Sequence, residues 1–311
     1  MAPRAFIFLI AVLTGAFLGG CGESIDPNEP QGFLQTKGSD TMVNAIQMVS
    51  EQFMKDYPHI FVAVTGGGSG VGIASLINRA CDVACASREM KPKEFDLAHR
   101  RGVDPKEFVV AYDGVAVIVN KDNPVDKLTI QDLHRIFTGK APNWKEFGGK
   151  DLPIVTLSRE VSSGTHMYFK EEVVQLGQKD NHEEFSNETL LLTSSQAIVD
   201  EVAGNETAIG YLGMGYLSER TKAVRIARAS PPEESVASGG RRATSDAFYP
   251  PDVENVIKKT YPLSRPLYLY TDGEPQGIVQ RFVDFTLSPM GQTQFMETGF
   301  VPVGATLDRE K

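Results

Sequence analysis

The sequence predicts an α/β protein with two lobes, each built from mainly parallel sheets with flanking helices and joined by a two-strand hinge. Strand and helix signals alternate from residue 33 onward, which is typical of parallel sheets. Polar turns containing glycine lie at 38–41, 66–70 and 159–165, each after an expected strand and before an expected helix. Ligands of such sheets bind at the carboxyl ends of strands. Because the turns are far apart in the chain, we expect two lobes with a cleft between them.

The first third of the chain alternates short apolar runs with amphipathic stretches. Apolar residues recur at helical spacing from Val43 to Tyr57, and Pro58 ends that helix. Pro92 stands at the first position of another expected helix. The expected strands are 33–36, 60–65 and 82–86, and the expected helices are 41–57, 71–79 and 92–101.

The rest of the chain continues the alternation around one long β-branched run, 108–120. Asp113-Gly114 interrupts this run, which suits a strand that passes from one lobe to the other, and a hinge is expected there and at 263–269. The segment 230–251 is rich in Pro, Gly and Ser and predicts a mobile loop. Further helices are expected at 130–137, 166–174, 196–203, 277–287 and 291–298, and further strands at 154–157, 208–212 and 267–270. The expected first lobe is 32–112 with 266–311, and the second is 113–265.

The N-terminal segment has the pattern of a secretion signal. Residues 1–20 carry one charge, Arg4, before an apolar stretch that is short for a membrane span. The stretch ends in Leu18-Gly19-Gly20-Cys21, which predicts cleavage and lipidation at Cys21; a plain signal peptide with an incidental cysteine is the alternative. Residues 21–31 are polar and predict a tether. We therefore expect a lipid-anchored protein in the cell envelope, in the periplasm or on the outer face of the membrane.

The overall charge is acidic. Without residues 1–20 the chain has 30 basic and 40 acidic residues, for a net charge of −10. The electrostatic field of such an acidic protein does not attract nucleic acid or anionic lipid. Any bound anion must therefore be held by local hydrogen-bond donors and positive charges.

The sequence predicts neither a metal site nor a cofactor. Cys81 and Cys85 lie in an apolar run and are expected to be buried thiols, too far apart along a strand for a disulfide. The histidines show no metal-ligand spacing, and a surface position is expected for His166.

The turn 159–165 has the chemistry of an anion site. Arg159 offers a planar fork of donors, Ser163 and Thr165 offer hydroxyls, and Gly164 allows close approach of the backbone. A helix start adds N–H groups with partial positive charge. Taken alone, Ser163 is an ordinary helix N-cap.

The two upstream turns carry similar groups. Ser39, Asp40 and Thr41 lie in the first turn, and Ser69 lies in the second. Asp40 is also a candidate cap for the helix that begins at Thr41, and Ser69 alone is an ordinary turn residue. Three donor-rich helix starts in one chain predict one shared ligand.

From residue 33 to 303 the chain resembles the phosphate-binding proteins of bacterial ABC-type phosphate uptake systems, which are type II periplasmic binding proteins. The resemblance implies two lobes around one buried phosphate, with a membrane permease and an ATPase as partners. We expect a monomer that is not an enzyme. The resemblance rests on the order and number of short motifs: 38–41 (GSDT), 67–70 (GGSG), 113–120 (DGVAVIVN), 136–139 (IFTG), 143–144 (NW), 163–165 (SGT), 208–211 (AIGY) and 261–268 (YPLSRPLY).

The resemblance also implies the site residues, which are Ser39, Asp40, Thr41, Ser69, Ser87, Arg159, Ser163, Gly164 and Thr165. Two positions depart from the family pattern. Ser87 stands where many members have an aspartate that contacts phosphate, and Val161 stands where the best-known members have an acid that buttresses the arginine. Either Glu160 replaces that acid, or Arg159 has no fixed partner within its loop.

Selectivity for phosphate requires an acceptor for the proton that phosphate keeps and sulfate lacks. A carboxylate accepts that hydrogen and repels an unprotonated oxygen. Asp40 is the candidate, the Ser87 hydroxyl is a weaker acceptor, and Asp113 is a third candidate with capping or hinge bonding as its alternative role.

Three other functions compete with this interpretation. An enzyme is disfavoured, because the turn 66–72 lacks the P-loop lysine and the dinucleotide glycine spacing, and Val71 replaces the glycine of a nucleophile elbow. A binding protein for sulfate, molybdate or tungstate needs only hydrogen-bond donors in its site. The carboxylate of Asp40 argues against this function, because it repels an unprotonated oxygen. A phosphate sensor or adhesin has the same site, so the sequence does not separate it from a transport protein.

Overall fold

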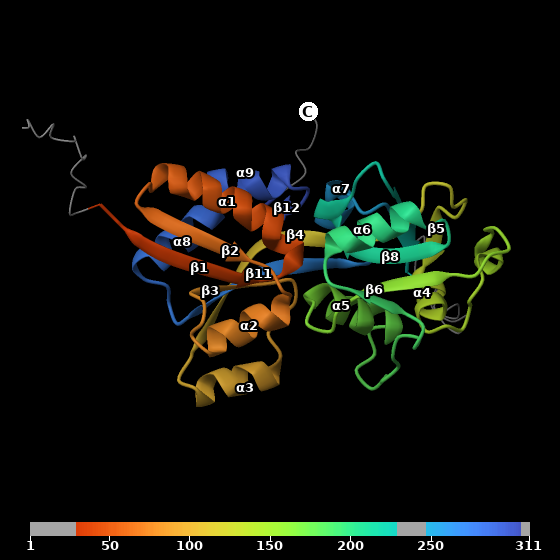
Figure 1. Ribbon diagram of the computed structural model, residues 1–311, viewed down its shortest axis with the longest axis horizontal. Coiled ribbons are helices and arrows are strands. Elements are labelled where there is room, and N and C mark those ends of the chain that lie inside the picture. The colour runs from red at the N-terminus through yellow and green to blue at the C-terminus, as the bar shows by residue number, and fades with distance from the viewer. Residues whose placement is uncertain (1–28, 229–246, 306–311) are drawn as a thin grey trace, which may run out of the picture.

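A curled ten-stranded sheet runs through the part of the chain that the structure describes, and a second sheet pairs two short strands of the second lobe. The structure is a computed structural model, and it describes residues 29–228 and 247–305. Within these ranges, ten strands form one sheet in the order β2-β1-β3-β11-β4-β8-β6-β7, with β9 and β12 also paired to β4. Helices cover both faces of each half of this sheet (Figure 1). The strands are β1 (Gly32–Gly38), β2 (Ile60–Thr65), β3 (Val83–Ala86), β4 (Pro105–Val119), β6 (Val155–Arg159), β7 (Leu190–Leu192), β8 (Ala208–Gly213), β9 (Lys222–Ala223), β11 (Ser264–Asp272) and β12 (Val301–Pro302).

The first lobe is built on β1, which lies between β2 and β3 and is parallel to both. The middle of the apolar stripe predicted within 41–57 is buried, and Phe53 meets the ring of Phe282 edge to face at 5.4 Å. On this face lie α1 (Val43–Asp56), α8 (Gly277–Leu287) and α9 (Pro289–Glu297), and on the other face lie α2 (Ser69–Ile77) and α3 (Pro92–Arg100) (Figure 1).

The second lobe is built on β6, which lies between β7 and β8 and is parallel to both. Its core contains the stacked rings of Phe169 and Tyr211, with centroids 3.7 Å apart. Trp144 is buried and its indole N–H donates to the carbonyl of Thr207, so it is a packing residue. The main helices are α4 (Ile130–Phe137), α5 (Gly164–Phe169) and α6 (Ser195–Gly204), with α6 on the face opposite α4 and α5 (Figure 1).

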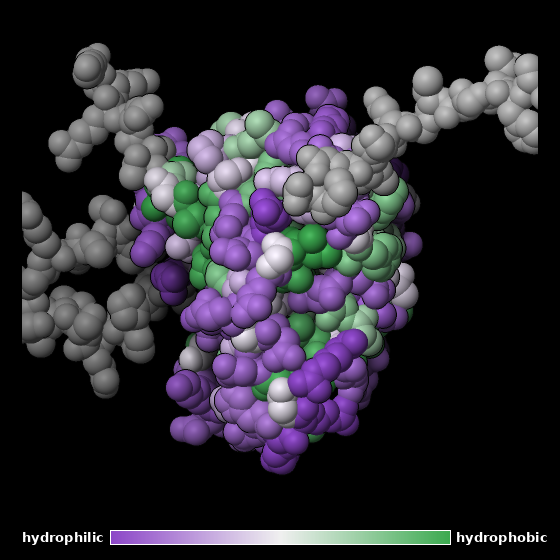
Figure 2. All heavy atoms as spheres, turned by 90° about the vertical axis from the view of Figure 1, so that its left-hand side faces the viewer, coloured by the Kyte–Doolittle hydropathy of each residue, from purple (hydrophilic) through white to green (hydrophobic). Residues whose placement is uncertain are grey.

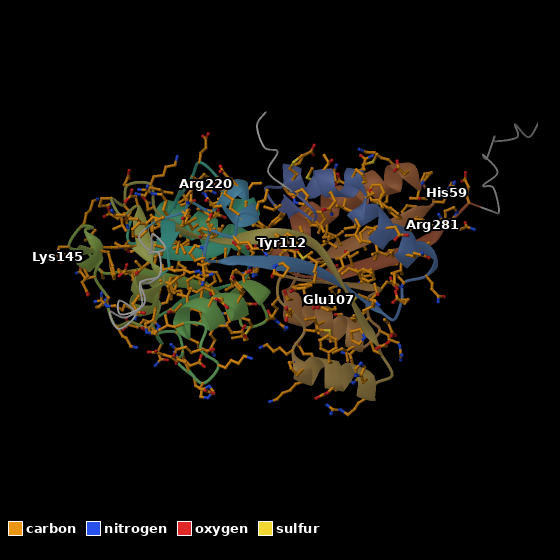
Figure 3. All side chains as sticks on the ribbon, turned by 180° about the vertical axis from the view of Figure 1, so that it is seen from behind. His59, Glu107, Tyr112, Lys145, Arg220 and Arg281 are labelled. Carbon is orange, nitrogen blue, oxygen red and sulfur yellow. The ribbon has the colours of Figure 1, made fainter. Side chains whose placement is uncertain are left out.

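Two long strands, β4 and β11, connect the lobes. They are antiparallel, and Arg265 of β11 lies opposite Asp113 of β4. Tyr112 of β4 lies near the middle of the molecule, between the far ends marked by Lys145 and His59 (Figure 3). In the ten-stranded sheet, every antiparallel pairing of the described residues involves β4 or β11. The parallel pairing typical of α/β proteins is confined to β2-β1-β3 in the first lobe and β8-β6-β7 in the second.

Most predicted elements are present with small changes at their ends. The strand 60–65 and the helices 130–137 and 277–287 have the predicted bounds. The predicted helix 166–174 is instead α5 followed by a π-helical turn, Lys170–Val174. The sequence analysis missed several elements that are too short to show the hydrophobic periodicity of a helix or a strand. They are the strands β5 (Lys127–Thr129), β7, β9, β10 (Arg225–Ala227) and β12, the helix α7 (Val253–Ile257), and the 3₁₀ turns at Asp40–Met42, Trp144–Phe147 and Met214–Tyr216.

The remaining predictions on chain organisation lie partly outside the described residues. This is so for the signal segment 1–20, for Cys21 with most of the tether, and for most of the loop 230–251. Within the described ranges, no helix combines the length and the apolar character that crossing a membrane requires. The lobe boundaries at 112/113 and 265/266 stay predictions.

The surface at the end of the first lobe is mostly hydrophilic, with smaller apolar areas between the polar ones (Figure 2). Phe33 and Phe61 contribute to the exposed apolar surface of this lobe, since they lie opposite each other on β1 and β2 and are more than half exposed.

Candidate anion-binding site

The three predicted turns meet between the lobes. The hydroxyl of Thr41, after β1, lies 2.8 Å from the hydroxyl of Thr165, after β6. The backbone N–H of Gly70, in the second turn, donates to the carbonyl of Ser162 at 2.9 Å. Both contacts join residues that are far apart in sequence, so the sheet brings the carboxyl ends of β1, β2 and β6 to one place, as the sequence predicted.

Ser69 and Ser87 form a buried hydroxyl pair at this junction. Their Oγ atoms lie 3.2 Å apart, and the backbone N–H of Ser87 donates to Oγ of Ser69 at 2.9 Å. Gly164 of the opposite lobe packs against both hydroxyls: a Cβ atom there would lie 2.6 Å from Oγ of Ser87 and closer still to Oγ of Ser69. Glycine is therefore required at this contact for lack of space.

Arg159 is buried at the end of β6 and is held by several acceptors. Its Nη2 donates to Oδ2 of Asp40 at 2.7 Å and to the carbonyl of Thr193 at 2.8 Å. Its Nε donates to the carbonyl of Leu192 at 3.2 Å, and its Nη1 donates to Oγ of Ser195 at 3.0 Å. Three of these four acceptors belong to the second lobe, like Arg159 itself, so they fix the guanidinium plane without help from the first lobe.

The carboxylate that buttresses Arg159 comes from the other lobe. Val161 is 71% exposed and Glu160 is also exposed, so neither supports the guanidinium, and the suggestion that Glu160 replaces the missing acid is wrong. The partner is Asp40, which the sequence had considered only as a cap or as a proton acceptor. The local loop pattern gave no sign of this pair, because its two members are 119 residues apart.

Asp40 does not cap the following helix. Its Oδ1 accepts from the backbone N–H of Gly67 at 2.8 Å, and its own carbonyl accepts from the hydroxyl of Tyr216 at 2.7 Å. Ser39 takes the N-cap position of the 3₁₀ turn Asp40–Met42 that precedes α1, without a capping hydrogen bond from its side chain. Asp40 therefore ties together the first turn, the second turn and the second lobe.

The two remaining predicted serines differ in their surroundings. Ser163 caps α5, since its Oγ accepts from the backbone N–H groups of Thr165 and His166 at 3.2 and 3.3 Å. Ser39 is buried, and its Oγ has no hydrogen-bond partner among the described residues. A buried hydroxyl without a partner is unfavourable, so it marks a position where a ligand atom or water is expected.

The structure adds Arg265 and Asp113 to this cluster. Nη2 of Arg265 donates to Oγ1 of Thr165 at 2.9 Å and to Oδ2 of Asp113 at 2.8 Å. Asp113 also accepts from the backbone N–H of Met214 at 3.0 Å, which is the hinge bonding that the sequence left open for it. Burial raises the pKa of Asp113, and the adjacent guanidinium of Arg265 opposes that rise. The sequence missed Arg265, although a single charge inside the apolar run 263–269 was an available signal.

His166 follows Thr165 and is buried, so the predicted surface position is wrong. Its Nδ1 lies 3.0 Å from Oγ of Ser158. Burial lowers the pKa of His166 to about 4, so the imidazole is neutral near pH 7.

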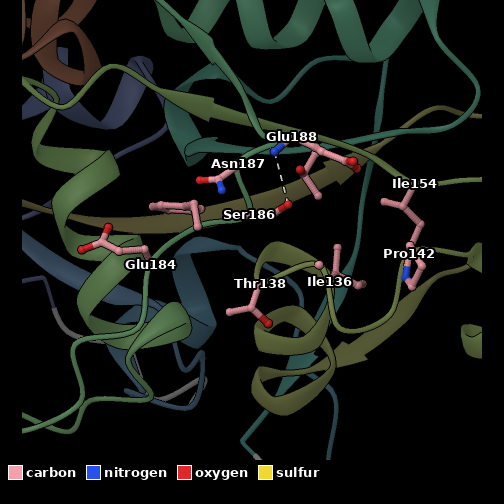
Figure 4. A pocket seen from close by; sticks show the side chains of 11 residues that line it. Ile136, Thr138, Pro142, Ile154, Glu184, Ser186, Asn187 and Glu188 are labelled. Carbon is pink, nitrogen blue, oxygen red and sulfur yellow. Dashed lines mark hydrogen bonds between the residues drawn. The ribbon is translucent and has the colours of Figure 1, made fainter.

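A separate hollow lies within the second lobe, away from this cluster. It has a volume of about 580 Å³ and is bordered by α4 and the segment around Phe185 (Figure 4). Its lining includes Glu184 and Glu188 and no lysine or arginine, so its charge does not suit an anion.

The described residues hold no group of three or more histidine, cysteine or acidic side chains arranged for a metal. Cys81 and Cys85 are free and buried, as predicted. Burial raises the pKa of Cys81 to about 12 and that of Cys85 further, which keeps both thiols protonated.

The fold is that of the type II periplasmic binding proteins, with two α/β lobes, two connecting strands and polar turns that meet between the lobes. The family model described as "PBP superfamily domain" matches residues 26–290. The phosphate-binding protein PstS of Staphylococcus saprophyticus is 31% identical over 94% of this chain and 87% of its own length. PstS of Pseudomonas aeruginosa is 28% identical over 97% of this chain and 95% of its own length.

A solved structure supports the same assignment. The putative phosphate ABC transporter substrate-binding protein of Clostridium perfringens, solved with bound phosphate, is 31% identical, with a TM-score of 0.74 over 88% of this chain and 100% of its own. The chain belongs to the PBP superfamily and, within it, to the PstS-like phosphate-binding proteins.

Proposed function

We propose that this protein is an extracytoplasmic solute-binding protein that captures inorganic phosphate between its lobes and delivers it to an ABC permease with its ATPase. The observation that carries the proposal is the contact between Thr41 of the first lobe and Thr165 of the second, with the Arg159–Asp40 pair beside it. The relatives named PstS support phosphate as the ligand.

The proposed ligand residues are those that the resemblance implied: Ser39, Asp40, Thr41, Ser69, Ser87, Arg159, Ser163, Gly164 and Thr165. Burying a phosphate dianion is costly unless hydrogen bonds replace its water. Buried hydroxyls supply neutral donors, and Arg159 supplies a charged donor that its neighbours hold in place. Donors fixed in advance lower the entropic cost of binding.

Asp40 is the proposed acceptor for the proton of the ligand. Both of its carboxylate oxygens already accept one hydrogen bond, from Gly67 and from Arg159. Each carboxylate oxygen has a second lone pair, so Asp40 can still accept from a protonated phosphate oxygen. The hydroxyl of Ser87 is the second choice for this role.

The proposed lobes are 32–112 with 266–311 and 113–265. We place the hinge at Asp113-Gly114 in β4 and at 263–269 in β11, since these strands carry the chain between the halves. Rotation about these two strands would separate Thr41 from Thr165 and admit the ligand.

We further propose a monomer without catalytic activity, anchored through lipid on Cys21 at the outer face of the membrane or in the periplasm. The lipobox-like pattern at 18–21 supports this. Replacing Cys21 with serine should move the protein from the membrane to the soluble fraction on cell fractionation. Retention of the variant in the membrane fraction would argue against lipid attachment.

Titration calorimetry with phosphate, arsenate, sulfate and molybdate tests the proposed ligand. We expect saturable binding of phosphate with one ligand per chain, similar binding of arsenate, and much weaker binding of sulfate. The proposal would be contradicted if titration with phosphate gave no heat of binding while titration with another anion did.

A second candidate is a binding protein for a fully deprotonated oxyanion such as sulfate, molybdate or tungstate. It is favoured by Ser87 at the family's acidic position and by the hydrogen bonds that already occupy Asp40. Tight sulfate or molybdate binding in the same titrations would support it over phosphate.

A further inference from the structure

We infer that Arg265 is a second guanidinium ligand of the anion, with its Nη1 group directed to the bound oxyanion. The inference rests on the proposed anion site and adds a residue that neither the sequence nor the resemblance assigned. Arg265 is 2% exposed and belongs to β11, one of the strands that connect the lobes.

The first observation is an incomplete hydrogen-bond set. Nε and Nη2 of Arg265 donate to Asp113 at 3.1 and 2.8 Å, and Nη2 also reaches Thr165. Nη1 is buried and has no hydrogen-bond partner among the described residues. A buried N–H of a charged group without an acceptor is costly, so an acceptor is expected in the functional state.

The second observation is that Arg265 contacts the first turn of the proposed site, which holds another buried polar group without a partner. Nη2 of Arg265 is 3.4 Å from Oγ1 of Thr41, and Thr41 is two residues from Ser39, whose Oγ is also buried without a partner. Two unsatisfied buried groups in one cluster, one of them always charged, suit an anion with several oxygen acceptors.

The third observation concerns charge. Asp113 is fully buried and fixes two of the donor atoms of Arg265, so its carboxylate orients the guanidinium and leaves Nη1 for the ligand. Because Asp40 balances Arg159 in the same way, the ligand meets two oriented guanidinium groups without a large excess of positive charge.

The test removes Arg265 without leaving Asp113 as an unpaired buried charge. The double variant Asp113→Asn/Arg265→Gln removes both charges, and Asp113→Asn/Arg265→Met is a second version with an apolar side chain of similar length. Arg135→Gln/Glu146→Gln is the matched control, because it removes an arginine–carboxylate pair on the surface of α4. Circular dichroism and the thermal midpoint identify the variants that fold.

Phosphate affinity is measured by titration calorimetry for each folded variant. We expect a loss of about 10- to 100-fold in the double variants, which is the range for a hydrogen bond from a charged group, and a change under twofold in the control. The loss should be larger at about pH 8.5, where phosphate is the dianion, than at about pH 5.5, where it is mainly the monoanion.

Two results would overturn the inference. One is a folded double variant whose phosphate affinity is within about twofold of the wild type. The other is an equal loss at both pH values, which indicates a purely structural effect. A wild-type protein that binds no phosphate would instead refute the proposed function, so the two failures are distinguishable.

Discussion

Two arginine–aspartate pairs lie at the proposed anion site, but they differ in burial and in the elements that they join. Arg159 and Asp40 join the end of β6 in one lobe to the first turn of the other, and Asp40 keeps 17% of its side chain exposed. Arg265 and Asp113 lie opposite each other on the paired strands β11 and β4, and both are almost fully buried. One pair bridges elements that the proposed opening would separate, whereas the other belongs to the strands that connect them.

This difference predicts how each pair contributes. The Arg265–Asp113 pair is held by strand pairing in any state of the lobes, so its loss should affect folding in addition to ligand binding. The Arg159–Asp40 pair forms only when the lobes approach, so its loss should affect ligand binding and closure more than folding.

The largest expected effect is on stability at the buried pair. Asp113→Ala leaves the guanidinium of Arg265 buried without its counter-charge and should lower the free energy of unfolding by about 3–5 kcal/mol. Asp40→Ala should lower it by less, because Arg159 keeps three other acceptors, the carbonyls of Leu192 and Thr193 and the hydroxyl of Ser195. Urea unfolding of both variants without ligand measures the difference, and equal losses would remove the distinction between the pairs.

The helix α5, which follows the turn after Arg159, contains a titratable group, His166. Its pKa is about 4 in the folded protein and near 6.5 in the unfolded chain, so between these values protonation favours unfolding. Stability should therefore rise with pH from about 4 to about 6.5, by up to about 3 kcal/mol from this residue. His166→Asn should flatten that part of the pH profile in urea unfolding, and an unchanged profile would contradict the prediction.

The next effect is on binding at the pair that bridges the lobes. Arg159→Ala removes the charged donor fixed by Ser195 and the carbonyls of Leu192 and Thr193, and phosphate affinity should fall at least about tenfold, or about 1.4 kcal/mol. Arg135→Ala, on the surface of α4, is the control and should bind normally. Near-normal phosphate binding by Arg159→Ala in titration calorimetry would show that this arginine does not bind the ligand.

The smallest effect concerns selectivity. Asp40→Asn keeps the shape of the side chain but removes the charge that repels an unprotonated oxygen, so phosphate binding should weaken several-fold and sulfate should compete better. Competition titrations of phosphate against sulfate measure the ratio. An unchanged ratio of phosphate to sulfate affinity would indicate that Asp40 is not the acceptor and that the hydroxyl of Ser87 has this role.

Much of the fold was readable from the sequence because its elements are long and periodic. The stripe from Val43 to Tyr57 predicted a buried helix face, and the run 108–120 predicted a strand between the lobes; both are present. Short elements such as β7 and β12 were missed, because two or three residues carry no measurable period.

The candidate site was readable in part for the same reason. Glycine and hydroxyl residues at strand ends pointed to Ser69, Gly164 and Thr165, and the structure brings these together. The partners of the charged groups were not readable. Asp40 was considered as a cap and as a proton acceptor but not as the partner of Arg159, and Arg265 was not considered, because ion pairs between residues more than 100 positions apart leave no local pattern.

The sequence by itself determined the α/β alternation and the chemistry of each turn, since both depend on residues within one or two helical turns of each other. Only the tertiary structure decided which charges are neutralised, which hydroxyls face one another and which buried groups lack a partner. Those properties depend on distances across the sheet, which the curled strands and their crossover connections set, and neighbouring residues in the chain do not encode them.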